Sequence, residues 1–235
     1  MLVATVPAEM FGTNCYVVAT GPGEQCVVID PGIGVIDRLE AVLAEHRLRP
    51  AAVVLSHGHL DHTFSVAPVC DARGITAYIH PDDRELLADP AKGLSVDLAM
   101  LFGGRLPYAE PADVAALPDT GTITVAGLEL TVDLAPGHTR GSVLFRPAEP
   151  DREGRPLCFS GDVLFAGSIG RTDLPGGDGA AMLTSLRDKV LPLPDETMVL
   201  PGHGPSTTIG RERVSNPFLR GLGDETPQTA PDRGW

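Results

Sequence analysis

A run of six residues, from His57 to His62, contains four side chains that can bind a metal ion: His57, His59, Asp61 and His62. Buried without partners, each of these groups would cost desolvation energy, and protonated imidazoles packed this closely would repel one another. A metal ion bound by all of them removes both penalties. The run therefore predicts a metal site.

Three more potential ligands, His138, Asp162 and His203, each follow a glycine at the end of an expected strand. Glycine has no side chain, so the backbone can turn sharply there and approach the site closely. If these strands end at one sheet edge, all the ligands converge. His46, among charged residues, is expected to be solvated, and His80, before a proline, is expected to be structural.

Seven ligands are too many for one tetrahedral zinc ion. They divide into His57, His59 and His138 for a first metal and Asp61, His62 and His203 for a second, with Asp162 bridging the two. A water must complete both shells, and open positions of this kind indicate catalysis. We expect two divalent ions, zinc first, with iron or manganese as alternatives for such ligands.

The elements that position these residues follow from the pattern of apolar residues. An uncharged, β-branched segment at 51–55 predicts the buried strand that precedes the run of ligands. Other strands are predicted at 16–19, 25–29, 75–79, 142–145, 157–160 and 197–200, with a hairpin at 122–132 that turns at Ala126 and Gly127. Helices are predicted at 36–48, 65–72 and 180–190. Frequent proline and glycine predict a long surface excursion between 90 and 118.

The composition is that of a folded chain, since 43% of the 235 residues are hydrophobic. One domain is expected over residues 1–222, with a flexible C-terminal tail at 223–235. The net charge of −13 argues against nucleic acid or an anionic membrane as a partner. No bilayer-spanning stretch or basic signal region is present, and the four cysteines are scattered. These features predict a cytoplasmic protein with reduced thiols.

With these residues in this order, the chain resembles the metallo-β-lactamase superfamily over almost its whole length. The resemblance implies a four-layer αββα sandwich with the metals at the edge of its two sheets. The segment 168–177, Ser-Ile-Gly-Arg-Thr-Asp-Leu-Pro-Gly-Gly, is similar to the glyoxalase II-like (hydroxyacylglutathione hydrolase-like) branch. The aspartate at 162 also fits that branch, because true β-lactamases do not have aspartate there.

The chain departs from that branch in its glutathione-binding parts. The helical C-terminal extension that grips glutathione is missing, since the sequence ends at residue 235. Arg171 falls where the branch has a lysine, and Asp173 falls where it has a tyrosine. Arg171 is our candidate for binding a substrate carboxylate. An ion pair of Arg171 with Asp173 or Asp178 is an equally open interpretation.

The site and the resemblance together favour a metal-dependent hydrolase that cleaves thioesters of the S-2-hydroxyacylglutathione type with a metal-bridging hydroxide. Asp61 is expected to orient this hydroxide and accept its proton, and a thiolate leaves without a protein acid. The alternative is a persulfide dioxygenase, for which the resemblance implies one Fe(II) held by His57, His138 and Asp162. A lactonase or phosphodiesterase is less favoured. A binding module would lack one or more ligands, and none is missing. The oligomeric state is left open.

Overall fold

The computed structural model describes residues 1–94 and 108–222, whose strands form two six-stranded sheets and a small two-stranded one. The first sheet has six strands in chain order: β1 (Leu2–Pro7), β2 (Asn14–Ala19), β3 (Gln25–Ile29), β4 (Arg49–Val54), β5 (Thr76–Ile79) and β6 (Val114–Ala116). Strands β1 to β3 are antiparallel neighbours, whereas β3 to β6 are parallel. The parallel strands therefore share one carboxyl edge.

The second sheet consists of β14 (Thr207–Thr208), β13 (Met198–Pro201), β10 (Leu157–Gly161), β9 (Val143–Pro147), β8 (Leu128–Leu134) and β7 (Thr120–Val125). Its six strands also lie in chain order, from β7 at one edge to β14 at the other. Strands β7 and β8 form the predicted hairpin, whose turn residues Ala126 and Gly127 both have positive φ. The small sheet pairs β11 (Leu164–Phe165) with β12 (Ser168–Ile169).

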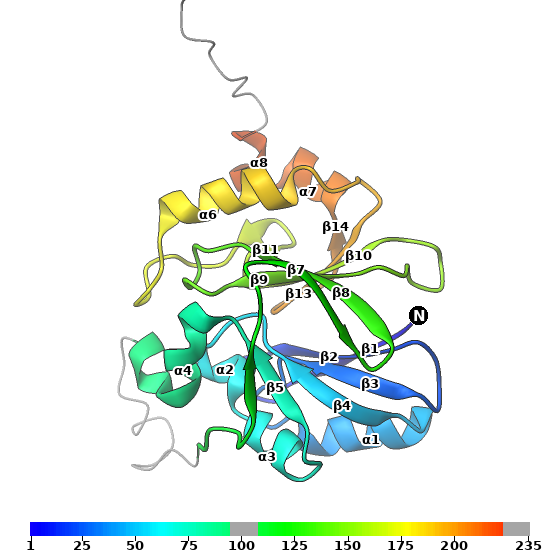
Figure 1. Cartoon of the computed structure of the whole chain (residues 1–235). Helices are drawn as coiled ribbons and strands as arrows, with labels where there is room; N and C mark the ends of the chain where they lie inside the picture. Colours follow the sequence, from blue (N-terminus) through cyan, green and yellow to red (C-terminus); the bar gives the residue numbers. More distant parts are fainter. Residues whose placement is uncertain (95–107, 223–235) are drawn as a thin grey trace, which may run out of the picture.

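Helices cover the outer face of each large sheet (Figure 1). On the side of the first sheet lie α1 (Ile36–His46), α2 (Leu60–Thr63), α3 (Val66–Asp71), η1 (Pro81–Asp83), α4 (Arg84–Ala88) and η2 (Pro90–Gly93). On the side of the second lie α6 (Gly179–Ser185), the π-helical η3 (Leu186–Val190), α7 (Ile209–Ser215) and α8 (Pro217–Arg220). The four layers confirm the predicted αββα sandwich. Within 1–94 and 108–222, no helix is both long enough and apolar enough to span a membrane.

The apolar core is divided between the layers, because strands present alternate residues to opposite faces. In β2, Val17 packs in the cluster beneath α1, whereas Val18 packs between the two sheets. In β9, Phe145 lies between the sheets and Leu144 packs toward Met182 of α6. Strands buried on both faces explain why their sequences are nearly continuous apolar runs.

Several sequence expectations differ from the structure in detail. The prediction of a long surface excursion at 90–118 is wrong at Val114–Ala116. These three apolar residues form an edge strand that pairs with β5. The helix predicted at 180–190 changes to π-helical geometry from Leu186. Strand β1 and helices α7 and α8 were not predicted. Residues 95–107 of the excursion and the tail predicted at 223–235 lie outside the described residues. The four cysteines are buried and free, as expected.

Candidate metal centre

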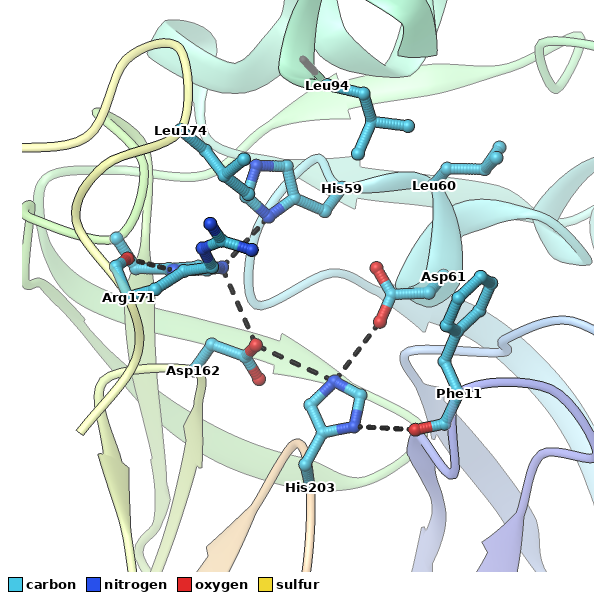
Figure 2. A pocket seen from close by; sticks show the side chains of 10 residues that line it. Phe11, His59, Leu60, Asp61, Leu94, Asp162, Arg171, Leu174 and His203 are labelled. Carbon is cyan, nitrogen blue, oxygen red and sulfur yellow. Dashed lines mark hydrogen bonds and ion pairs between the residues drawn. The ribbon is translucent and has the colours of Figure 1, made fainter. Parts of the chain in front are cut away.

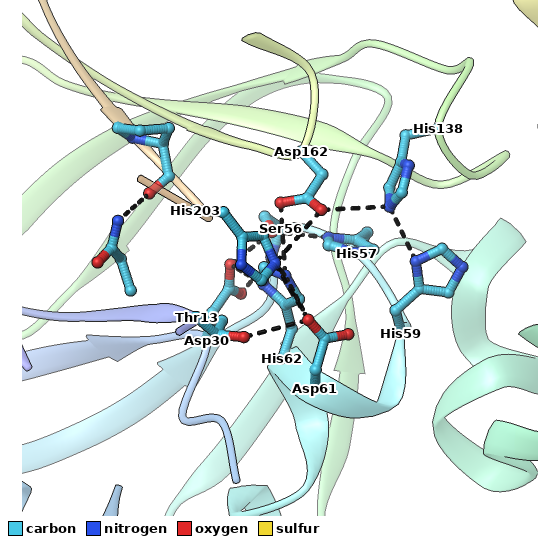
Figure 3. Close-up of polar contacts among 12 residues, drawn as sticks. Thr13, Asp30, Ser56, His57, His59, Asp61, His62, His138, Asp162 and His203 are labelled. Carbon is cyan, nitrogen blue, oxygen red and sulfur yellow. Dashed lines mark hydrogen bonds and ion pairs between the residues drawn. The ribbon is translucent and has the colours of Figure 1, made fainter. Parts of the chain in front are cut away.

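The predicted ligands lie at one edge of the sandwich, where strands of both sheets end. Strand β4 leads into the run 57–62, and it is parallel to β3 and β5. In the second sheet β10 and β13 are parallel, and β8 has the same direction because β9 is antiparallel to both β8 and β10. These three strands lead to His138, Asp162 and His203. The structure therefore brings all seven candidates together (Figure 3).

Glycines permit the close approach of these segments, as the sequence predicted. Gly161 has a φ of +47°, and a Cβ there would lie 2.6 Å from Cβ of Ser56. A Cβ on Gly202 would lie 2.2 Å from Oδ1 of Asp162 and 2.7 Å from Cε1 of His62. No real Cβ makes contacts this short, so larger residues at these positions would displace the ligands.

His57, His59 and His138 form the first ligand group, with one nitrogen of each within 4.8 Å of the others. Nδ1 of His59 lies 2.8 Å from Nε2 of His138. Nε2 of His57 is buried and has no hydrogen-bond partner among the described residues. Converging imidazole nitrogens with an unpaired buried atom are suited to a cation, which accepts lone pairs from all three.

Asp61, His62 and His203 form the second group, again within 4.8 Å. Nε2 of His203 lies 3.1 Å from Oδ2 of Asp61 and 3.2 Å from Nε2 of His62. Asp61 and His62 lie on the one-turn helix α2. The helix places the two adjacent side chains side by side at the sheet edge (Figure 3).

The carboxylate of Asp162 lies between the two groups. Its Oδ1 is 3.4 Å from Nε2 of His62, and its Oδ2 is 3.5 Å from Nε2 of His138 and 3.6 Å from Nε2 of His203. One carboxylate that faces both groups is the arrangement that a bridging ligand requires. The donor set therefore fits two divalent ions that share Asp162.

Four of the five ligand histidines have an outward nitrogen next to a fixed acceptor or hydroxyl, which orients the ring, whereas Nε2 of His59 has no such partner among the described residues. Nδ1 of His62 pairs with Oδ2 of the buried Asp30 at 3.0 Å. Nδ1 of His57 lies 3.0 Å from Oγ of Ser56, which itself donates to Asp30. Nδ1 of His138 lies 2.7 Å from the backbone carbonyl oxygen of Arg171. Nδ1 of His203 lies 3.1 Å from the backbone carbonyl oxygen of Phe11. These partners leave the other nitrogen of each ring pointing inward.

Asp83 ties the first group together, although sequence analysis did not single it out. It is only 1% exposed. Its carboxylate accepts hydrogen bonds from the backbone N–H of Gly58 at 2.8 Å, the N–H of Gly141 at 2.7 Å and the Thr139 hydroxyl at 2.6 Å. Gly58 lies between two ligands of the run, and Thr139 follows the third ligand, His138. One buried side chain thus joins the two segments.

The two groups differ in their protonation. Burial lowers the pKa of His57 well below its usual range and lowers the pKa of His59 to about 3, with neighbouring imidazoles adding to the effect. Both rings are therefore neutral near pH 7 and offer lone pairs. Burial also acts to lower the pKa of His62, but the carboxylates of Asp61 and Asp162 outweigh it and raise that pKa. A metal ion would replace the proton held there.

A cavity of about 330 Å³ lies against both ligand groups (Figure 2). Its lining includes Arg171, the predicted substrate residue. The guanidinium of Arg171 binds Asp173 with both edges, Nε to Oδ1 at 2.7 Å and Nη2 to Oδ2 at 2.8 Å. The ion-pair interpretation is therefore observed with Asp173. His80, whose Nε2 lies 3.1 Å from Oδ1 of Asp119, belongs to neither ligand group.

Two curated relatives match nearly the whole chain. The probable metallo-hydrolase YqgX of Bacillus subtilis is 37% identical over 217 residues, which cover 92% of this chain and 97% of the relative. The hydroxyacylglutathione hydrolase GloC of Haemophilus influenzae is 33% identical over 225 residues, which cover 93% and 98%.

Solved structures show the same fold. The B3 metallo-beta-lactamase BLEG-1 superposes with a TM-score of 0.79 at 39% identity, covering 93% of this chain and 99% of its own. A di-iron-bound form of TTHA1623 superposes with a TM-score of 0.74 at 39% identity, covering 92% and 100%. Residues 8–203 match the family model of the metallo-beta-lactamase superfamily, as the resemblance in sequence implied, and the chain belongs to this superfamily.

Proposed function

We propose that this protein is a binuclear metal-dependent hydrolase that cleaves thioesters, with S-2-hydroxyacylglutathiones as the first substrates to test. The observation that carries the proposal is the position of Asp162 between two three-residue ligand groups at one cavity. The similarity to the hydroxyacylglutathione hydrolase GloC supports the choice of thioesters.

In this proposal His57, His59 and His138 would hold one ion, Asp61, His62 and His203 would hold the other, and Asp162 would be shared by both. Divalent ions bound there supply a Lewis acid and a hydroxide that is available near neutral pH. Zinc is the expected metal, and the di-iron form of the relative TTHA1623 supports iron as the alternative. Hydrolysis forms a C–O bond from water and breaks the acyl C–S bond, giving a carboxylate, a thiol and one proton that is released to solvent.

Asp61 is the residue proposed to orient the attacking water. Its carboxylate lines the cavity, and its Oδ2 accepts a hydrogen bond from Oγ1 of Thr13 at 3.1 Å. Burial acts to raise the pKa of Asp61, but the imidazoles of His62 and His203 outweigh it and hold that pKa below its usual range. An ionised, fixed carboxylate can accept a hydrogen bond from water and direct its lone pair at the substrate.

Arg171 remains the proposed substrate contact, at the rim of the cavity. Its pair with Asp173 is solvent-exposed, and water screens exposed ion pairs, so that they contribute little to stability. A substrate carboxylate could therefore replace Asp173 at little cost. The exchange would place the charged part of the substrate at the rim, not among the metal ligands.

Hydrolysis of β-lactams is a second candidate, because BLEG-1, a B3 metallo-beta-lactamase, is 39% identical across nearly the full chain. The nitrogen of a β-lactam amide is a poorer leaving group than a thiolate, so its departure depends more on a proton being delivered to it. A persulfide dioxygenase would need only His57, His138 and Asp162 around one iron, and the last two lie 3.5 Å apart.

The test is turnover by protein loaded separately with zinc, iron and manganese, with metal content measured for each preparation. Substrates are S-lactoylglutathione, a simple acyl thioester, a β-lactam and a lactone, and oxygen uptake is followed with glutathione persulfide. We expect thioester cleavage to exceed the other reactions in the form that holds two ions. Absence of thioester cleavage by fully loaded protein would refute the proposal, and oxygen uptake by a single-iron form would favour the dioxygenase.

A further inference from the structure

The cavity over the ligand groups has an apolar wall. Phe11, Leu60, Leu94 and Leu174 line it, whereas the polar lining residues are the ligands and Arg171 (Figure 2). Leu60, Leu94 and Leu174 lie on the side of His59, and Phe11 lies beside Asp61. An apolar wall that faces a few convergent polar groups is typical of a site for a small ligand. The part of the substrate next to the reacting carbonyl would contact this wall.

Phe11 is held at the wall under strain. Its φ is +60°, a region that bulky residues rarely adopt, and its side chain is 57% exposed. With this backbone conformation its carbonyl binds Nδ1 of His203 while its ring lines the cavity. Both strain and apolar exposure cost free energy, and outliers of this kind cluster at ligand sites. The ring is therefore available for a ligand to cover.

The described residues that line the cavity offer little to a charged thiol carrier. Among the lining residues that the structure describes, Arg171 is the only lysine or arginine. Asp173 binds its guanidinium through both Nε and Nη2. The charge of Arg171 is thus already balanced within the protein. A carrier with free carboxylates gains only by displacing Asp173.

The position of the wall points the same way. The apolar residues line the same cavity of about 330 Å³ as the ligands His59, Asp61, His138, Asp162 and His203. The acyl group, which is next to the reacting carbonyl, is therefore the part of the substrate placed to contact this wall.

We propose that the preferred substrates are thioesters of small apolar acyl groups, which bind against Phe11 and the three leucines, and that the thiol carrier contributes little to recognition. This inference rests on the proposed thioesterase function and narrows it. It predicts that glutathione thioesters are cleaved, but that neither glutathione nor a 2-hydroxyl group is required.

The acyl preference is tested with metal-loaded protein and two isosteric substrates, S-lactoylglutathione and S-isobutyrylglutathione, in which a methyl replaces the hydroxyl. We expect kcat/KM to be at least as high for the isobutyryl compound, and to rise about fourfold for each methylene from acetyl to butanoyl. A site that hydrogen-bonds the hydroxyl would reject the isobutyryl compound strongly. A preference for lactoyl would therefore overturn the inference.

The wall is tested with Phe11→Ala, using Phe218→Ala as the matched control because Phe218 is also exposed but lies on α8 and does not line the cavity. Phe11→Ala should lower the ratio of kcat/KM for butanoyl over acetyl thioesters by up to about tenfold, as expected for loss of one apolar contact. The control should leave the ratio unchanged. An unchanged ratio in folded Phe11→Ala would contradict the assignment of the wall.

The carrier is tested by comparing butanoyl thioesters of glutathione and of N-acetylcysteamine. We expect kcat/KM to agree within tenfold, and Asp173→Asn, which releases Arg171, to increase the preference for glutathione. A loss of more than tenfold with the truncated carrier would overturn the inference and leave the thioesterase function standing. Cleavage of none of these compounds by loaded protein would refute the thioesterase function itself, and this inference with it.

Discussion

Replacing Asp83 with alanine tests whether one buried carboxylate holds the first ligand group in place. The change leaves the N–H groups of Gly58 and Gly141 and the hydroxyl of Thr139 without their acceptor, and all three residues are buried. Each unsatisfied donor costs about 1–3 kcal/mol, or about 3–9 kcal/mol for the three together. Asp83 itself carries a desolvation cost, because burial raises its pKa in spite of these bonds.

The variant no longer carries that desolvation cost, and water can enter the space left by the carboxylate. We therefore expect the loss of stability to be near the lower end of the range of about 3–9 kcal/mol. We expect the free energy of unfolding to fall by about 3 kcal/mol. In a chain of this size, that change lowers Tm by about 6–12 °C. Thermal unfolding of the metal-loaded protein measures this shift.

The loss of metal affinity should be selective. Asp83 contacts the segments that carry His57, His59 and His138, but none of the three residues that donate hydrogen bonds to it belongs to the second group. Outer partners of ligands typically contribute 10–100-fold to metal affinity. Competition with a chromophoric chelator should therefore show one weakened site and one nearly unchanged site.

Asp82→Ala is the matched control, because Asp82 is the neighbouring acid and its side chain is 58% exposed. It should change neither Tm nor metal affinity appreciably. Equal weakening of both sites in folded Asp83→Ala, or no weakening, would refute the reasoning. If Asp83→Ala does not fold, Thr139→Val removes a single bond to Asp83, and Thr139→Ser should restore it.

Three other changes have expected results. Asp61→Asn should lower kcat by about 10²–10⁴-fold with a smaller change in KM, since Asp61 is proposed to orient the attacking water. Steady-state kinetics measure both constants, and full activity of the variant would exclude this role. Gly202→Ala should weaken metal binding, because its Cβ would strike the carboxylate of Asp162. Gly21→Ala, which has open space around it, should leave metal binding unchanged. The metal content of both variants after dialysis tests this difference. Burial raises the pKa of all four thiols, so unfolding should become easier as pH rises above about 9, by up to about 1.4 kcal/mol per pH unit for each thiol. Cys158→Ala should flatten this alkaline loss in a denaturant titration, and an unchanged slope would contradict the assignment.

The sequence was informative where chemistry or periodicity demands particular residue types. All seven candidate ligands could be predicted, since histidine and aspartate at such spacing have few other uses, and the structure brings them together. Individual strands could be predicted because strands buried on both faces are continuous apolar runs, whereas the four-layer sandwich was expected from the resemblance to the superfamily. Strand β6 was missed because three small apolar residues flanked by prolines resemble a loop. Its pairing with β5 comes from long-range contacts, which local patterns do not contain.

Asp30 and Asp83 could not be identified from the sequence for a different reason. Asp30, with a φ of +50°, stands in Asp-Pro-Gly, which is typical of a turn, and its contact with His62 depends on how β3 and β4 pair. Asp83 binds mostly backbone N–H groups, and every residue except proline provides one, so no partner residue type marks its role. A metal ligand is identified by its own chemistry, whereas a residue that positions ligands through the backbone is identified only by its place in the fold. The selective loss expected for Asp83→Ala is therefore a test of the structure that the sequence pattern alone does not provide.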